Sequence, residues 1–211
     1  MKSIAIEQTR EMLCEVCRAV IGQKPYLTEV DSKIGDGDHG IGMAGGMEKA
    51  EKALTDKTDF DSVNEVFKTM GMAMLNSMGG ASGVIFGTMF LGGIKGKEKM
   101  TELTCENFPQ IMRDALEAVK KRGQAQRGDK TMVDAFEPAV EAMEENRNSL
   151  EEMLEKAANA AEQGMEDTKK YVAKFGRAKS LMERSVGYQD AGATSVAIIF
   201  KAMKDYVEKA D

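Results

Sequence analysis

Apolar side chains recur three and four positions apart over long stretches of this 211-residue chain, and this spacing limits its fold class. Leu13, Val16 and Val20 follow it near the start, and Ile199 and Met203 follow it near the end. Such a repeat places the residues on one face of an α-helix, whereas the strict alternation typical of strands is hard to find. Because proline occurs only three times, long helices can run uninterrupted. The sequence predicts an all-α protein.

The helical pattern divides the chain into about eight segments joined by short loops. We expect helices over residues 4–21, 26–33, 42–54, 62–78, 81–94, 107–122, 129–143, 150–174 and 192–209, the second of which is short. We found no low-complexity linker and no internal repeat, so we expect a single domain over residues 1–211. Successive helices with short connections favour an antiparallel, up-and-down bundle or barrel.

Composition excludes several classes of partner. The chain has 29 Lys and Arg against 35 Asp and Glu, a net charge of −6, which would repel nucleic acid. Glycines interrupt the longest apolar stretch, residues 84–94, so we expect no membrane span, and residues 1–10 do not resemble a signal peptide. Cys14, Cys17 and Cys105 are an odd number on helical patterns, which favours reduced core thiols. We expect a cytoplasmic protein.

Three aspartates lie within eight residues in a glycine-rich loop. Asp31, Asp36 and Asp38 would repel one another unless a divalent cation takes their oxygens, and Mg²⁺ prefers a few carboxylates together with water and phosphate. A calcium loop that starts at Asp36 does not fit, because Gly40 and Met47 stand where oxygen ligands should be. The loop predicts either a magnesium site or a solvated turn that uses Asp and Gly for their backbone tolerance.

Two further loops lead directly into apolar helices. Residues 79–83 (Gly-Gly-Ala-Ser-Gly) and 190–194 (Asp-Ala-Gly-Ala-Thr) can present backbone N–H groups to an anion at a helix N-terminus. Neither is a P-loop, because no Gly-Lys-Ser or Gly-Lys-Thr follows. Tight turns with helix caps are the alternative interpretation.

Basic residues near these loops could balance phosphate charge. They are Lys130, Arg177 and Arg184, each of which could equally be a solvated or salt-bridged surface residue. His39 is the only histidine, and its place beside Asp38 suggests an imidazole within reach of metal-bound phosphate.

The segments 31–40, 79–83, 128–132 and 176–187, in this order and spacing, resemble the nucleotide-binding L subunits of bacterial dihydroxyacetone kinases. The resemblance extends over essentially the whole chain. It implies a barrel of eight antiparallel helices with the nucleotide at one rim, and two Mg²⁺ ions held by Asp31, Asp36 and Asp38. It also implies nucleotide contacts from a set of twelve residues: His39, Gly40, Ile41, Gly42, Ala81, Ser82, Gly123, Met132, Arg177, Asp190, Ala191 and Gly192.

The resemblance also implies a function. The chain would bind ADP or ATP and transfer a phosphoryl group from the magnesium-bound nucleotide to dihydroxyacetone, which a separate subunit holds. A phosphohistidine carrier fed from phosphoenolpyruvate would then recharge the nucleotide. The chain would supply positioning and electrostatics but no catalytic side chain of its own. A homodimer is allowed.

Two alternatives stay open at this point. The domain could serve another acceptor, such as a different ketose or a fatty acid, or it could be a regulatory module that holds ADP without transfer. The sequence departs from the family pattern at two positions, with Gly42 in place of Asn and Ala191 in place of Pro. The first change removes a side chain that could contact phosphate or metal.

Overall fold

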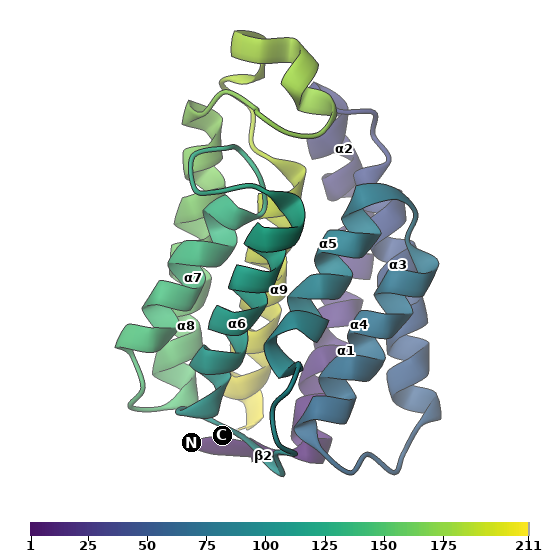
Figure 1. The fold of residues 1–211 in the computed structure, drawn as a ribbon, viewed down its shortest axis with the longest axis vertical. Coiled ribbons are helices and arrows are strands. Elements are labelled where there is room, and N and C mark those ends of the chain that lie inside the picture. The colour runs from purple at the N-terminus through teal and green to yellow at the C-terminus, as the bar shows by residue number, and fades with distance from the viewer. Residues whose placement is uncertain (211) are drawn as a thin grey trace.

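The computed structural model describes residues 1–210 and confirms the all-α fold class (Figure 1). In this range the α-helices are α1 (Ile6–Gly22), α2 (Lys24–Ile34), α3 (His39–Asp56), α4 (Val63–Ser77), α5 (Gly80–Leu91), α6 (Asn107–Gly123), α7 (Val133–Glu145), α8 (Leu150–Asp167) and α9 (Ala191–Ala210). The 3-10 helices are η1 (Gly92–Ile94), η2 (Thr168–Lys170) and η3 (Arg177–Ser185). The strands are β1 (Ser3–Ala5) and β2 (Glu102–Thr104).

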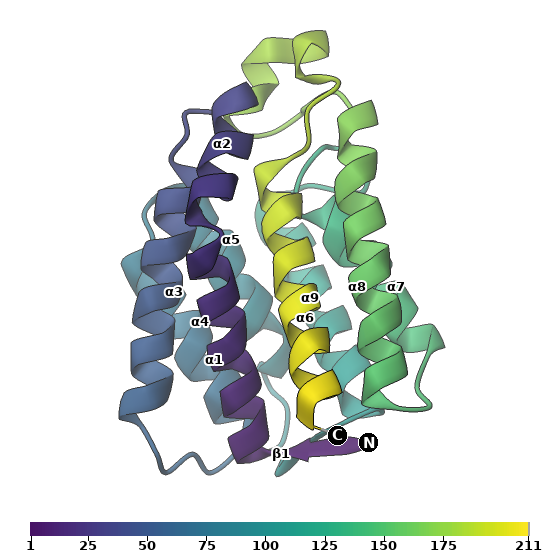
Figure 2. The ribbon, with the colours of Figure 1, turned by 180° about the vertical axis from the view of Figure 1, so that it is seen from behind.

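Eight of these helices form a closed ring. Contacts run in order through α1, α3, α4, α5, α6, α7, α8 and α9, and α9 packs against α1 again. Figure 2 shows α9 between α1 and α8, where the ring closes. Neighbouring helices run in opposite directions, and α2 lies outside the ring, against α3 and α9 at one end. The expected up-and-down barrel is therefore confirmed.

Apolar faces of all eight ring helices fill the barrel. Phe67 contacts Phe90 and Phe108 with ring centroids 6.5 and 6.4 Å apart, and Phe136 contacts Phe200 at 6.1 Å. Buried methionines belong to the same core, where a flexible thioether side chain fits irregular spaces. None of the helices in residues 1–210 combines the length and apolarity needed to cross a bilayer.

Besides the unexpected η3 and shifts of a few residues at other helix ends, the structure differs from the expected helices at two places. The chain begins with strand β1, which pairs antiparallel with β2 so that Ile4 lies opposite Leu103. Three-residue strands are too short to produce a recognisable alternation.

The second difference is the end of α8, which stops at Asp167 although the apolar pattern predicted a helix to residue 174. The Thr168 hydroxyl donates to the Met165 carbonyl at 2.5 Å, and Lys130 Nζ donates to the Thr168 carbonyl at 2.7 Å. After η2 the chain leaves the direction of α8, and these contacts hold the turn. Residues 171–190, here called the strap, then connect η2 to α9.

Candidate functional site

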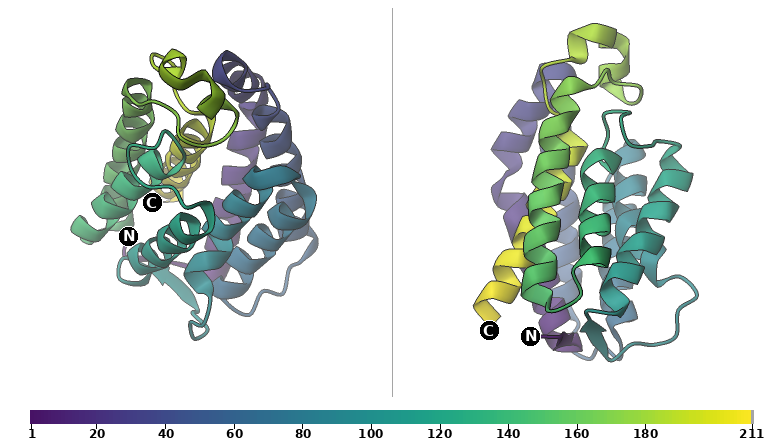
Figure 3. Two further views of the ribbon diagram at one scale, coloured as in Figure 1. Left: turned by 45° about the horizontal axis from the view of Figure 1, so that its top comes forward. Right: turned by 90° about the vertical axis from the view of Figure 1, so that its left-hand side faces the viewer.

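A pocket of about 840 Å³ lies at the end of the barrel where α2, the strap and several helix connections meet. Figure 3, with this rim turned forward, shows these connections around the barrel opening. Four separate chain segments line the pocket: the α2–α3 loop, the start of α5, the turn before α7, and the strap with the start of α9. Its volume falls within the range of small-molecule and cofactor sites.

The pocket brings together most of the residues singled out from the sequence. They are Asp31, Asp36, Asp38, His39, Ile41, Gly42, Ala81, Ser82, Lys130, Met132, Arg177, Asp190, Ala191 and Gly192. Gly40 and Gly123 do not line it. A Cβ on Gly40 would lie 2.3 Å from Thr28 Oγ1 and 2.4 Å from the Lys24 carbonyl oxygen, so this glycine permits close packing of α3 on α2.

The acidic loop joins α2 to α3. Asp31 Oδ2 accepts a hydrogen bond from the backbone N–H of His39 at 3.2 Å. The other oxygen, Oδ1, lies only 2.2 Å from the position that a Cβ on Gly35 would take. Only glycine at position 35 allows this orientation of the carboxylate. Asp38 precedes α3, but its side chain caps no backbone N–H, so its oxygens remain available for a ligand.

Asp36 contacts a cation from the opposite side of the pocket. Arg177 Nε, from the strap, lies 2.8 Å from Asp36 Oδ2, and both side chains are more than one-third exposed. This ion pair connects the strap to the acidic loop across the mouth of the pocket. Screening by water makes such a pair weak, so a ligand can replace it.

The acidic loop has the oxygen donors that a hard divalent cation prefers. Within residues 1–210, however, no group of three or more carboxylate, imidazole or thiol side chains lies close enough together to hold a metal ion. Asp36 is turned toward Arg177 and Asp31 toward the backbone of His39. The residues therefore fit Mg²⁺ by donor type, while a bound ion would have to draw Asp36 away from Arg177.

The N-terminus of α5 forms the second wall. Gly79 and Gly80 lead into the helix, and Gly80 adopts φ +70°, a conformation that favours glycine. No side chain caps this helix, and the space beside both glycines is open. The first-turn N–H groups, with the helix dipole behind them, are suited to an anion such as phosphate.

Apolar side chains line the rest of the pocket and offer a surface for a flat, partly apolar group. They are Ile34, Met78, Ile85, Phe86, Met132 and Phe175. Sequence reasoning did not separate most of these from core residues, because the same helical spacing produces both.

His39 lies at the pocket wall with its ring directed to the barrel. Its Nε2 is 2.8 Å from Ser195 Oγ on α9, and its ring centroid is 5.9 Å from that of Phe86. Burial lowers the pKa of His39, with the negative charge of Asp31 opposing the shift. The imidazole is therefore neutral near pH 7, and it joins α3 to α9 by a hydrogen bond rather than adding positive charge. Nothing in the sequence indicated Ser195.

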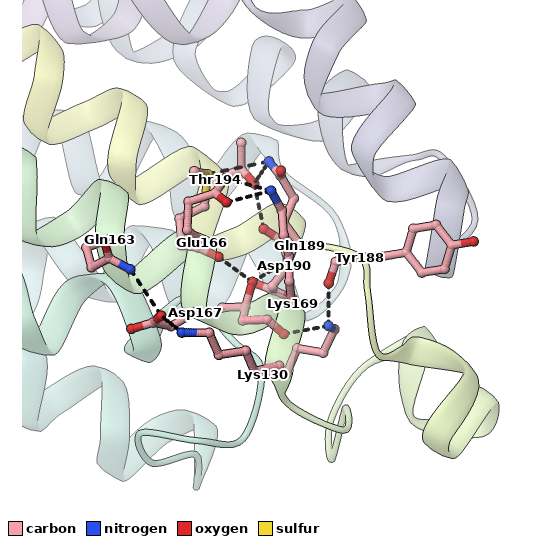
Figure 4. Close-up of polar contacts among 12 residues, drawn as sticks. Lys130, Gln163, Glu166, Asp167, Lys169, Tyr188, Gln189, Asp190 and Thr194 are labelled. Atoms are coloured by element: carbon pink, nitrogen blue, oxygen red, sulfur yellow. Dashed lines mark hydrogen bonds and ion pairs between the residues drawn. The ribbon is translucent and has the colours of Figure 1, made fainter.

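The strap is held to the barrel by a buried lysine. Lys130, 2% exposed, donates from Nζ to the Thr168 carbonyl at 2.7 Å and to the Tyr188 carbonyl. Figure 4 shows this side chain reaching the backbone beside Tyr188. Burial lowers the pKa of Lys130, while the charges of Asp190 and Asp134 oppose that shift. Lys130 is thus not the solvated surface residue that was one of the roles weighed from the sequence. It also lines the pocket, and its role in balancing phosphate charge stays a prediction.

Asp190 ends the strap and caps α9. Its Oδ2 accepts from the Ala193 N–H at 2.8 Å, and its own N–H donates to Thr168 Oγ1 at 2.9 Å. Burial raises the pKa of Asp190 to about 7, and the Lys130 charge and the hydrogen bonds from the backbone oppose the shift. A Cβ on Gly192 would lie 3.0 Å from Asp190 Oδ2, so glycine lets this carboxylate lie against the helix.

Comparison with known proteins places this chain among nucleotide-dependent kinases. The family model described as the DAK2 domain matches residues 33–205. The ADP-binding subunit DhaL of PEP-dependent dihydroxyacetone kinase 1 from Listeria innocua is 42% identical over 180 residues, covering 85% of this chain and 86% of that protein. The DhaL subunit of the Escherichia coli PEP-dependent enzyme is 39% identical over 184 residues, covering 86% and 87%.

A solved structure shares the fold. The dihydroxyacetone kinase of C. freundii, crystallised with AMP-PNP and Mg²⁺, superposes with a TM-score of 0.74 at 24% identity. The superposition covers 97% of this chain and 35% of that one, so the present chain corresponds to about a third of the longer kinase.

Proposed function

This chain belongs to the DAK2 domain family, and on that premise we propose that it is the ADP-binding subunit of a phosphoenolpyruvate-dependent dihydroxyacetone kinase. The proposal gives it a single domain over residues 1–211, of which Asp211 lies outside the described residues. The observation that carries it is the pocket at the rim, where an acidic loop faces an uncapped helix N-terminus across an apolar floor.

Each wall of the pocket suits one part of a nucleotide. We propose that Asp31, Asp36 and Asp38 hold two Mg²⁺ ions, which would neutralise charge on the phosphate oxygens. The N–H groups at Ala81 and Ser82 bind phosphate oxygens, and the apolar side chains contact the base. Phosphoryl transfer then depends on positioning and electrostatics rather than on a covalent intermediate with the chain.

Arg177 has two roles in this proposal. Without nucleotide it neutralises Asp36, with the two groups 2.8 Å apart. With nucleotide, the guanidinium leaves Asp36 to the metal and turns to a phosphate, for which its planar set of N–H donors is suited. The remaining residues of the proposed nucleotide site shape the pocket or the helix ends beside it. They are His39 to Gly42, Gly123, Met132 and Asp190 to Gly192.

The proposal includes two partners. Dihydroxyacetone is held by a separate substrate-binding subunit, and a phosphohistidine carrier recharges ADP to ATP on this chain. These follow from the similarity to subunits named as parts of PEP-dependent kinases. A cytoplasmic location agrees with this role. Mixing the purified chain with each candidate partner and measuring the mass of the complex by light scattering tests the assembly and would also reveal a homodimer.

Calorimetry tests the metal and nucleotide assignment. Asp36→Ala should abolish magnesium-dependent ADP binding while the helical circular dichroism signal stays intact, because the residue is on an exposed loop. Asp59→Ala is the matched control, since Asp59 is also exposed but lies in the α3–α4 connection at the other end of the barrel. Undiminished ADP binding by the Asp36 variant would refute the assignment.

A turnover assay tests the acceptor. The chain, its partners, phosphoenolpyruvate and one candidate acceptor at a time should yield phosphorylated dihydroxyacetone. Transfer only to another ketose or to a fatty acid would favour the related kinases, and tight ADP binding without transfer to any acceptor would favour a regulatory module.

A further inference from the structure

The two ends of the strap meet at one side chain. Lys130 Nζ donates to the Thr168 carbonyl, just before the strap begins, and to the Tyr188 carbonyl, near its end. Thr168 and Tyr188 are 20 residues apart in sequence, so one ammonium group joins the two ends of a long loop. Closing a loop of this length costs conformational entropy, so a contact at its base helps to hold it in one conformation.

The position of Lys130 is unusual for a lysine. Its side chain is 2% exposed and its backbone adopts φ +60°, which costs free energy in a residue other than glycine. Removing an ammonium group from water is also unfavourable unless hydrogen bonds and opposite charges compensate. Here two carbonyl oxygens accept from it, and the carboxylates of Asp134 and Asp190 lie near enough to interact. These costs are consistent with a specific role for the amine.

Secondary contacts hold the strap in one conformation around this point. Lys174 Nζ lies 2.7 Å from Asp129 Oδ1, and the Lys174 N–H donates to the Asp129 carbonyl at 3.2 Å. Within the strap, the Ala173 N–H donates to Ser185 Oγ at 2.9 Å. The Gly187 N–H donates to the Lys169 carbonyl at 2.7 Å. The strap is therefore a hydrogen-bonded unit attached to the residues 129–130.

The attached strap supplies one wall of the pocket. Phe175, Gly176, Arg177 and Ala178 line it, and Arg177 reaches Asp36 on the far side. A ligand bound between the acidic loop and α5 would therefore contact the strap on one side, so an ordered strap adds to the contacts that hold it.

We propose that Lys130 is a positioning residue that latches the strap over the nucleotide pocket and thereby slows release of the nucleotide. The proposal rests on the proposed function, because it presumes that the ligand is a nucleotide. Lys130 acts through the strap, with its amine directed to two backbone carbonyls. The latch keeps ADP on the protein while it is recharged.

Two substitutions distinguish the effect of the Lys130 amine from the effect of its strained backbone conformation. Lys130→Met keeps the apolar stem but leaves both carbonyls without their donor. Lys130→Gly also removes the donor but relieves the strain of φ +60°. Lys169→Met is the matched control, because the Lys169 side chain is half-buried and, within residues 1–210, its ammonium group pairs with Glu166. We would load each protein with a fluorescent ADP analogue and magnesium and measure its dissociation rate by stopped flow, and follow amide hydrogen exchange without nucleotide.

Both Lys130 variants should release the analogue about tenfold faster or more, since hydrogen bonds from a charged group are lost, while the control matches the unmodified protein. The gain in amide exchange should be confined to residues 171–190. If either variant, Lys130→Met or Lys130→Gly, releases the analogue as slowly as the unmodified protein, the proposed role of the amine is overturned. Faster exchange throughout the barrel helices would show a general structural role and would also overturn it.

The unmodified protein provides a test that needs no variant. If the latch is closed in solution, the amides of Ala173, Lys174 and Gly187 exchange slowly before nucleotide is added. Exchange at the rate of a free chain would overturn the proposal even if the variants fail to fold. Absence of magnesium-dependent binding of the analogue would instead refute the proposed function, and the exchange data would still decide whether the strap is latched.

Discussion

Replacing Asp190 by asparagine should remove one contribution to the pH dependence of stability in the nucleotide-free protein, a loss of stability with rising pH. In the native protein, burial raises the pKa of Asp190 from 3.8 to about 7. Between these values the folded chain holds a proton that the unfolded chain releases, so the free energy of unfolding falls as pH rises. The asparagine side chain cannot titrate, yet its oxygen can still accept from the Ala193 N–H and cap α9.

The expected size follows from the pKa change. From pH 5 to pH 7, a group with a folded pKa near 7 and an unfolded pKa near 3.8 changes the free energy of unfolding by about 2 kcal/mol. Water in the open pocket screens part of this effect, so we expect about 1–2 kcal/mol. Lys130 and Asp134 interact with Asp190 and shape the transition, but neither is altered by the substitution.

Urea unfolding of both proteins at pH 5, 6 and 7 measures the effect. The burial of His39 lowers its pKa and gives the opposite trend, with stability rising with pH below 6.5, and this contribution cancels when the two proteins are compared. We expect the unmodified protein to lose stability relative to Asp190→Asn as pH rises. Parallel curves over this range would show that Asp190 is ionised throughout, and the reasoning from burial would be wrong.

Two further predictions concern glycine and proline at the rim, both checked by thermal unfolding. Gly40→Ala should lower the free energy of unfolding by about 1–3 kcal/mol, because its Cβ would lie 2.4 Å from the Lys24 carbonyl oxygen. Gly42→Ala lies in the same helix but its Cβ meets open space, so this variant should raise the free energy of unfolding by up to about 1 kcal/mol. Equal stabilities would contradict the packing argument. Ala191→Pro should stabilise the protein by about 0.4–1 kcal/mol, because residue 191 is the first of α9, where proline fits; a lower melting temperature would count against this.

Much of the fold could be predicted from the sequence because burial in a helical barrel repeats with the period of the helix. Every ring helix presents one apolar face to a common core, so spacing alone located α1 to α9 with shifts of a few residues at their ends. The end of α8 could not be predicted this way. The turn that follows it is held by Lys130, which is 38 residues away from Thr168 in sequence.

The site was only partly predictable. The acidic loop and the glycine turn before α5 carry local signals, since carboxylate density and glycine at a helix start can be recognised in a short segment. That these two segments meet at one rim was predicted from the family resemblance, because no local pattern indicates it. The inward roles of His39 and Lys130 depend on Ser195 and Tyr188, which approach them only in the folded chain.

The strands and the site lie at opposite ends of the barrel. Strand β1 and the end of α9 both lie at the end of the barrel opposite α2, as Figure 2 shows, and α2 contributes Asp31 and Ile34 to the pocket. A reporter or a surface tether joined through either terminus would thus leave the nucleotide-bearing end facing the solution. An immobilised sample would then present the pocket to added proteins in the same orientation from molecule to molecule.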